Sequence, residues 1–259
     1  MAYDGTAYSG WQMQPNGTTV QGVLEKAIST LLGQEIRVTG AGRTDTGVHA
    51  SYYVVHFDLP GDEKEHRSGF PDPADKQFVF KLNRFLPGDV VIYRVQQVPP
   101  EMHARFSATY RTYHYHISTV KPLFDRAYVH YLYGKLDTAE IGRCCDIILE
   151  TNDFTSFSKL HSDVKTNNCR VMEAAWKTIE NGYRFEIRAD RFLRNMVRSL
   201  VGTLIDVGQG KLDHRDFRRI AEAKDRGKAG QSAPAHALFL VDIGYEGLKW
   251  SSPSGPLLR

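Results

Sequence analysis

Apolar side chains recur along this chain with two spacings, and each spacing predicts one kind of secondary structure. Between residues 20 and 31 they recur every three or four positions, after threonines that can cap a helix and before Gly33, which can end one. The same spacing predicts helices over 78–86, 138–149 (after a capping box of Asp137 with Glu140), 191–207 and from Asp213 to about 224. Alternating or continuous apolar runs predict strands over 36–39, 50–57, 90–98, 109–119, 171–179, 183–189 and 238–245.

The order of these elements predicts an α+β protein. With the end of a strand at residues 1–3, residues 1–104 follow the order β-α-β-β-α-β, and residues 105–247 repeat it with one extra helix. We therefore expect two ferredoxin-like (RRM-like) units with largely antiparallel sheets, a surface loop over 58–75 and a loose tail over 248–259. Such sheets bind RNA in some proteins but occur in many others, so this order predicts no function by itself.

Composition indicates the class of protein and its cellular compartment. Hydrophobic residues make up 41% and charged residues 24% of the 259 positions, as in ordinary globular proteins, and the net charge of +3 is too small to indicate a polyanionic partner. The three cysteines have no C-x-x-C spacing, which argues against a disulfide framework and a zinc site and favours a reducing compartment. No signal peptide or membrane-spanning apolar run is visible, so the sequence predicts a soluble, cytoplasmic protein.

One polar stretch stands out, residues 40–50 with the sequence GAGRTDTGVHA, between two predicted strands. Three glycines in eight residues allow unusual backbone angles and close approach by another molecule. Asp45 lies among them, and we expect Arg43 to keep it ionised by lowering its pKa, so that it could act as a nucleophile or base. The structural alternative is an aspartate that only closes an Asx-turn.

Three other motifs share letters with this chain, and all fit poorly. In the stretch that starts with Gly40 and Gly42 the third glycine is misplaced for a dinucleotide fingerprint, and a strand follows instead of a helix. The tripeptide at 45–47 is that of an aspartic protease, but no second copy exists to share a proton. Gly210-Lys211 lacks the next hydroxyl residue and the first glycine of a P-loop.

Arginines gather in the second half of the chain. They are Arg184, Arg188, Arg191, Arg194 and Arg198. If a helix begins at 191, the last three fall at i, i+3 and i+7 and form one stripe. Glu186 and Asp190 neutralise part of this charge. The stripe could be solvated surface, but the planar guanidinium also favours phosphate recognition.

Residues 42–50, GRTDTGVHA, resemble the active-site motif of the bacterial tRNA pseudouridine synthase A family. Stretches 3–6 (YDGT), 10–12 (GWQ) and 192–198 (FLRNMVR) also resemble the family, and the likeness extends over about residues 3–246. It implies a pseudouridine synthase fold with two units around a central basic cleft. It further implies isomerisation of uridine to pseudouridine at positions 38–40 of the tRNA anticodon stem–loop, by a homodimer, without a metal, cofactor or small-molecule cosubstrate.

The resemblance also implies roles for individual residues. Asp45 would be the nucleophile, with Arg43 and Arg198 as catalytic partners, and Tyr113 would stack on the target uracil. The other implied substrate contacts are Thr44, Arg191 and Arg194. Trp11 is interpreted as a packed aromatic, and His114 with His116 as polar surface rather than metal ligands. Ala237 departs from the glycine that the family often has there.

Two other function classes remain open at this stage. The chain could be an RNA-binding module without catalytic activity, which would make no pseudouridine. It could also be a hydrolase that uses Asp45 as a base and releases free uracil. Assaying tRNA for pseudouridine separates the three possibilities.

Overall fold

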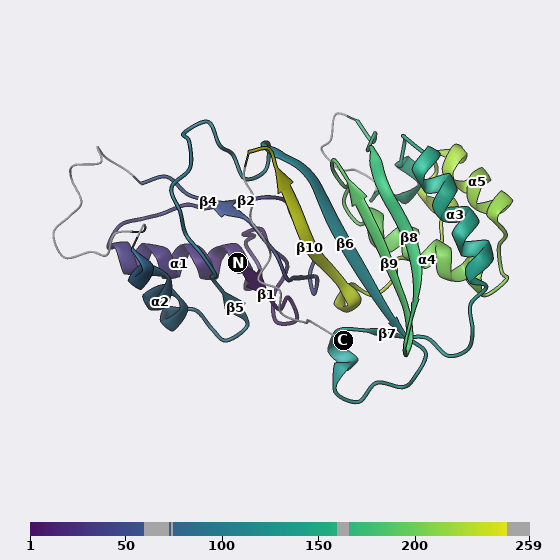
Figure 1. Ribbon diagram of the computed structural model, residues 1–259, viewed down its shortest axis with the longest axis horizontal. Coiled ribbons are helices and arrows are strands. Elements are labelled where there is room, and N and C mark those ends of the chain that lie inside the picture. The colour runs from purple at the N-terminus through teal and green to yellow at the C-terminus, as the bar shows by residue number, and fades with distance from the viewer. Residues whose placement is uncertain (60–72, 74, 160–165, 248–259) are drawn as a thin grey trace. The chain divides into compact units, whose positions relative to one another are not determined.

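Figure 1 shows a computed structural model of the chain, which describes residues 1–59, 73, 75–159 and 166–247. Most of the predicted loop 58–75 and the whole predicted tail 248–259 therefore lie outside the described residues. The protein is α+β, and its strands pair mostly antiparallel. The chain divides into two compact units, residues 1–109 with the end of the chain from 241, and residues 110–240.

The first unit holds two helices and short strands. They are β1 (Ala2–Tyr3), α1 (Val20–Leu32), β2 (Thr39–Gly40), β3 (His49–Ala50), β4 (Val55–His56), α2 (Lys76–Phe85) and β5 (Val90–Val91). β1 lies between β3 and β5, while β2 pairs with β4. The predicted strand 50–57 is thus split, because its beginning pairs with β1 and its end pairs with β2. The predicted strands 36–39 and 90–98 are likewise reduced to two paired residues each.

Helix α1 forms as its capping residues predict. The Thr19 side chain accepts a hydrogen bond from the Gly22 N–H, and Gly33 closes the helix with a φ of 64°, in the left-handed region that glycine adopts easily. Apolar residues such as Leu24 and Ile28 are buried on one face. Helix α2 begins after Asp75, which caps it, and lies beside α1 in Figure 1.

The second unit is a sheet covered by three helices. Its elements are β7 (His130–Tyr131), α3 (Thr138–Glu150), β8 (Val171–Ile179), β9 (Gly182–Ala189), α4 (Met196–Gly208), α5 (His214–Ala223) and most of β6 (Ala108–Ser118). The division falls after Thr109 in β6 and after Leu240 in β10 (Leu238–Tyr245), so the start of β6 and the larger part of β10 belong to the first unit. β9 pairs antiparallel with both β6 and β8. The helices α3, α4 and α5 lie together on one side of the hairpin formed by β8 and β9 (Figure 1).

The predicted helix over 191–207 starts five residues later than expected. Asn195 has a φ of 66°, so the backbone there is left-handed and α4 begins at Met196. Asparagine is one of the few residues that tolerates this conformation, and its amide is held by the Ser232 hydroxyl at 2.6 Å. Arg191 and Arg194 therefore precede the helix, and the predicted stripe of three arginines on one helix is wrong.

None of the helices in the described ranges is long and apolar enough to span a membrane.

Candidate active site

The stretch singled out in the sequence is a loop between β2 and β3. The Val48 N–H donates to the Asp45 carbonyl at 3.1 Å, which closes a four-residue turn. Its third residue, Gly47, has a φ of 77°, a value that glycine adopts without strain. The loop therefore needs this glycine to bring Asp45 and His49 into their positions.

The loop rests directly on the backbone of residues 5–11. The Trp11 N–H donates to the Thr44 carbonyl at 3.3 Å, and the Gly47 N–H donates to the Tyr8 carbonyl at 3.4 Å. A Cβ atom on Gly10 would lie 2.5 Å from the Thr44 oxygen, and one on Gly5 would lie 2.0 Å from the Val48 oxygen. Only glycines allow the two backbones to come this close.

His49 locks the end of the loop to the same segment. Its side chain is 1% exposed, and its Nδ1 accepts a hydrogen bond from the Gly5 N–H at 3.0 Å. The Asp4 carboxylate lies 3.0 Å from the same nitrogen, but we assign the backbone bond, because the amide has a proton to donate. His49 is thus a structural residue of the candidate site.

Three buried aromatic rings pack together and support the loop. Trp11 lies 4.3 Å from Tyr53 between ring centroids, and Tyr3 lies 5.5 Å from Tyr53. The Tyr53 hydroxyl donates to the Gly42 carbonyl, and the Tyr3 hydroxyl shares a 2.9 Å hydrogen bond with the Thr44 hydroxyl. Trp11 is 3% exposed, so its interpretation as a packed aromatic is confirmed.

Sequence analysis did not find the two tyrosines. The sequence shows only that a buried tyrosine hydroxyl needs a polar partner, and it does not identify that partner. The Thr44 side chain is 9% exposed and turned onto Tyr3.

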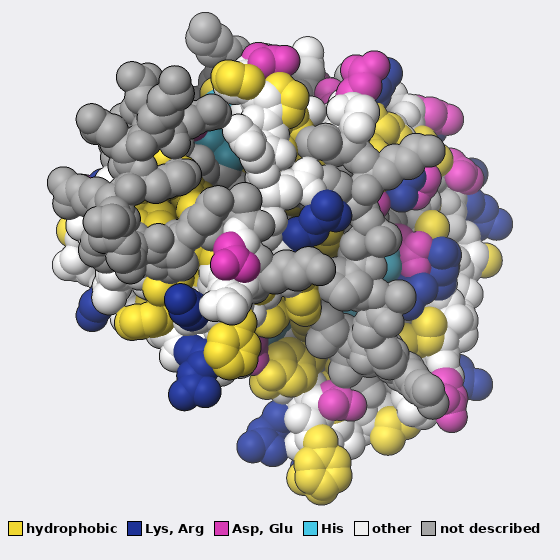
Figure 2. Space-filling view, turned by 60° about the vertical axis from the view of Figure 1, so that its left-hand side comes forward, with side chains coloured by type: hydrophobic (Ala, Val, Ile, Leu, Met, Phe, Trp, Pro, Cys, Tyr) yellow, Lys and Arg dark blue, Asp and Glu magenta, His cyan; other side chains and the backbone are white. Residues whose placement is uncertain are grey.

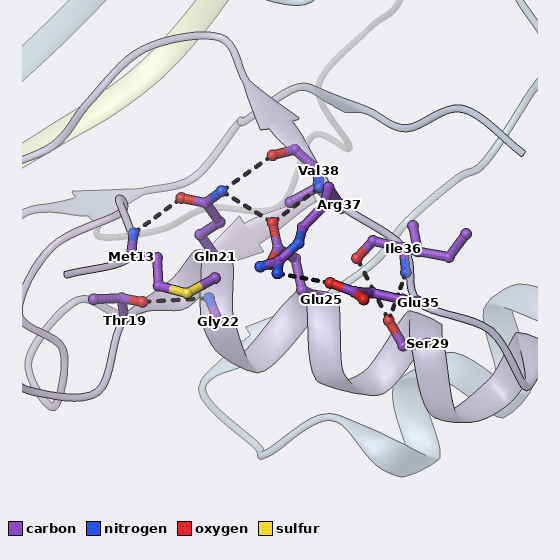
Figure 3. A network of polar contacts seen from close by, with 10 residues as sticks. All are labelled: Met13, Thr19, Gln21, Gly22, Glu25, Ser29, Glu35, Ile36, Arg37 and Val38. Atoms are coloured by element: carbon purple, nitrogen blue, oxygen red, sulfur yellow. Dashed lines mark hydrogen bonds and ion pairs between the residues drawn. The ribbon is translucent and has the colours of Figure 1, made fainter. Parts of the chain in front are cut away.

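A polar network fixes the segment that leads into β2 (Figure 3). Glu25 on α1 is 6% exposed, and its carboxylate accepts from the Val38 N–H at 3.0 Å and from the Gln21 amide at 3.0 Å. Gln21 also donates to the Val38 carbonyl at 3.2 Å. Because both backbone groups of Val38 are bound to α1, the helix sets where the loop begins.

Asp45 and Arg43 do not form the expected pair. Asp45 is partly exposed, whereas Arg43 is exposed and makes no ion pair with that carboxylate in the described structure. An exposed guanidinium gains little free energy from an ion pair in water, so closeness in sequence does not fix one.

Tyr113 and the five arginines between residues 184 and 198 belong to the second unit. Tyr113 lies on β6, partly exposed, with its ring edge-on to Phe192 at 5.0 Å between centroids. Two residues further on, Tyr115 is fully buried and donates to the Pro234 carbonyl, which makes it a packing residue. Arg198 on α4 donates through Nε to the Ala233 carbonyl at 2.8 Å, and the Ala233 N–H returns a bond to the Arg198 carbonyl.

Some arginines of the predicted cluster form ion pairs and others do not. On β9, Arg184 pairs with Glu186 at 2.6 Å and Arg188 pairs with Glu173 at 2.7 Å. No ion pair among the described residues involves Arg191 or Arg194. On the face shown in Figure 2, basic side chains lie among acidic and uncharged ones rather than in one continuous field.

Comparisons with known proteins identify one family. A family model described as tRNA pseudouridine synthase matches residues 1–107 and 150–246. A protein of Bacteroides thetaiotaomicron named tRNA pseudouridine synthase A is 52% identical over 249 residues, which are 95% of this chain and 88% of that protein. Proteins of the same name from Porphyromonas gingivalis (50% identical over 247 residues, 95% of each chain) and Bacillus pumilus (33% over 250 residues, 95% of this chain and 97% of that one) are also similar.

Proposed function

The chain belongs to the tRNA pseudouridine synthase family, isomerases that act on tRNA uridine, and we propose that Asp45 is its nucleophile. The observation that carries the proposal is the loop around Asp45, which is held by buried aromatic hydroxyls, by His49 and by close backbone contacts. A catalytic group must be fixed before its substrate arrives, and such a support provides this.

The reaction sets simple requirements. The N1–C1′ glycosidic bond of the uridine breaks, the base turns, and a C5–C1′ bond forms to the same sugar, while C5 loses its proton and N1 gains one. All atoms of the nucleotide are retained, so the proposed reaction requires no cosubstrate or cofactor. The chain must supply a nucleophile or base, a clamp for the base and a means of holding the target nucleotide out of its stack.

We assign these tasks from the family resemblance. Tyr113 stacks on the target uracil, and Arg198 helps to hold the flipped nucleotide at Asp45. Arg43 is a second catalytic partner of Asp45. Arg191 and Arg194, which carry no ion pair in the described structure, bind phosphates. For Thr44 we propose support of the substrate site, since its hydroxyl contacts Tyr3.

The resemblance also extends the proposal to the substrate and the assembly. The target uridines are those at positions 38–40 of the anticodon stem–loop, and the protein acts as a cytoplasmic homodimer. The two units are then variants of the ferredoxin-like fold, and one central basic cleft receives the tRNA. Light scattering should give a mass near twice the 29.3 kDa of one chain, and a monomeric mass would contradict the dimer.

The test compares wild type with Asp45→Asn on a tRNA transcript that has uridines at 38–40. We expect wild type to form pseudouridine at these positions and Asp45→Asn to form none while still binding tRNA. Asp58→Asn is a matched control, because Asp58 is an exposed aspartate of the same unit outside the loop. Equal modification by wild type and Asp45→Asn would refute the role of Asp45. Binding without pseudouridine in wild type would indicate an RNA-binding module, and free uracil would indicate a hydrolase.

A further inference from the structure

Two histidines of the first unit hold a turn over residues 103–107 that the proposed reaction does not use. The Ala104 N–H donates to Nδ1 of His56 at 3.0 Å. The next two amides, of Arg105 and Phe106, both donate to Nδ1 of His103, at 3.1 and 3.2 Å. Three successive backbone N–H groups are therefore bound by imidazole nitrogens, and the two rings are in contact, 4.6 Å between centroids.

Further bonds make this turn rigid. The Ser107 N–H donates to the His103 carbonyl at 2.9 Å, and the His103 N–H donates to the Ser107 hydroxyl at 3.0 Å. The buried Tyr245 hydroxyl donates to the Ala104 carbonyl at 2.5 Å. Burial, with His103 adding to it and Asp58 opposing it, lowers the pKa of His56, so the ring stays neutral and its Nδ1 can accept the bond from Ala104. The turn is thus formed before any ligand binds.

The turn presents an aromatic ring to solvent. Phe106 is 77% exposed, although burying such a ring would stabilise the fold by about 2 kcal/mol. The Arg105 guanidinium carbon lies 5.6 Å from the Phe106 ring centroid, and the His103 ring lies 4.4 Å from it. A fixed, open aromatic face with a cation beside it is the arrangement with which proteins stack unpaired bases.

We propose that Phe106, with Arg105 beside it, is a stacking platform for an unpaired base of the bound tRNA, a binding site that deepens the proposed function and rests on it. The pre-formed turn favours binding because no loop has to be ordered. A protein partner is less well matched, because the ring is flanked by Arg105 and Ser107 and by the partly exposed His103 rather than by further apolar side chains.

The test measures the dissociation constant of full-length tRNA at fixed salt for wild type, Phe106→Ala and Phe106→Trp. Stacking on one base corresponds to a loss of roughly tenfold in affinity for Phe106→Ala, and Phe106→Trp should restore it because its face also stacks. Tyr93→Ala, which removes another exposed aromatic ring of the same unit, should bind as wild type does.

The outcomes separate this proposal from the proposed function. Unchanged tRNA affinity in Phe106→Ala would overturn the platform while leaving catalysis at Asp45 intact. A change in molecular mass instead of tRNA affinity would assign Phe106 to a protein interface and also overturn it. Absence of pseudouridine with wild type would refute the proposed function. The comparison of tRNA affinities would still show whether Phe106 binds a base.

Discussion

Gly40 and Gly42 stand at the start of the candidate loop, yet their surroundings differ. A Cβ atom on Gly40 would lie 2.3 Å from the Tyr53 hydroxyl and 2.6 Å from the Trp11 ring, whereas one on Gly42 would meet nothing within 4 Å. We predict that Gly40→Ala lowers the free energy of unfolding by about 1–3 kcal/mol, because it overfills a packed site, and that it reduces pseudouridine formation.

Gly42→Ala is the matched control for this prediction. It adds the same methyl group two residues away and should change the unfolding free energy by less than about 0.5 kcal/mol. Urea unfolding of both variants, followed by circular dichroism, checks the pair. Equal stability of the two alanine variants would mean that the aromatic support does not constrain the loop at Gly40.

Single residues also mark the limit of what the sequence predicts. Asp45 could be singled out because its neighbours are unusual for a solvent turn. The expected ion pair with Arg43 is not part of the described structure, since surface charges are weakly constrained by sequence distance. Tyr3 and Tyr53 contact the loop across 41 and 11 residues of chain, and such contacts follow from the fold rather than from local pattern.

At the scale of elements, prediction succeeds where local signals agree with packing. Helix α1 and strand β10 were predicted nearly residue by residue, because caps or apolar runs mark both ends. The start of α4 was missed because it depends on Asn195, whose left-handed backbone is stabilised from Ser232, 37 residues away. The Asp137 capping box is only half formed, since Glu140 turns to the His214 N–H on α5 instead.

Strand β6 carries a buried histidine that should make the second unit sensitive to acid. His116 is 9% exposed, and burial, with His114 and Arg184 adding to it, lowers its pKa to about 4, while Glu186 opposes this. The unfolded imidazole takes up its proton near pH 6.5, so the unfolded state binds more protons between pH 6.5 and 4. Stability is therefore fully present above pH 6.5 and falls as the pH drops to 4.

We predict that this titration removes about 2 kcal/mol of unfolding free energy between pH 7 and pH 5. His116→Gln cannot titrate, so its stability should fall less over that interval than that of wild type. Urea midpoints of both proteins at the two pH values provide the measurement. An identical fall in the two proteins would show that His116 is not the group responsible.

On the scale of the whole molecule, the position of unpaired positive charge matters more for tRNA binding than the net charge does. The net charge is only +3, and the β9 arginines are paired with Glu186 and Glu173. Arg191 and Arg194 lie in the segment before α4 and have no ion pair within the described residues. Sequence analysis also grouped these two arginines in a helical stripe that does not exist, so their proposed role as RNA contacts rests on the family resemblance and on their unpaired charge.

This charge should appear in the salt dependence of tRNA binding. Each phosphate contact contributes roughly 0.7–0.9 to the slope of log affinity against log salt concentration, because binding releases counterions. We predict that Arg191→Ala and Arg194→Ala each flatten the slope by about 1, and that the double variant flattens it by about 2. Arg215→Ala is the control, an exposed arginine on α5 that likewise has no ion pair in the described part of the chain. Slopes that match wild type in the Arg191 and Arg194 variants would place both arginines outside the tRNA interface, and an equal flattening in Arg215→Ala would show that the charge acts without a specific contact.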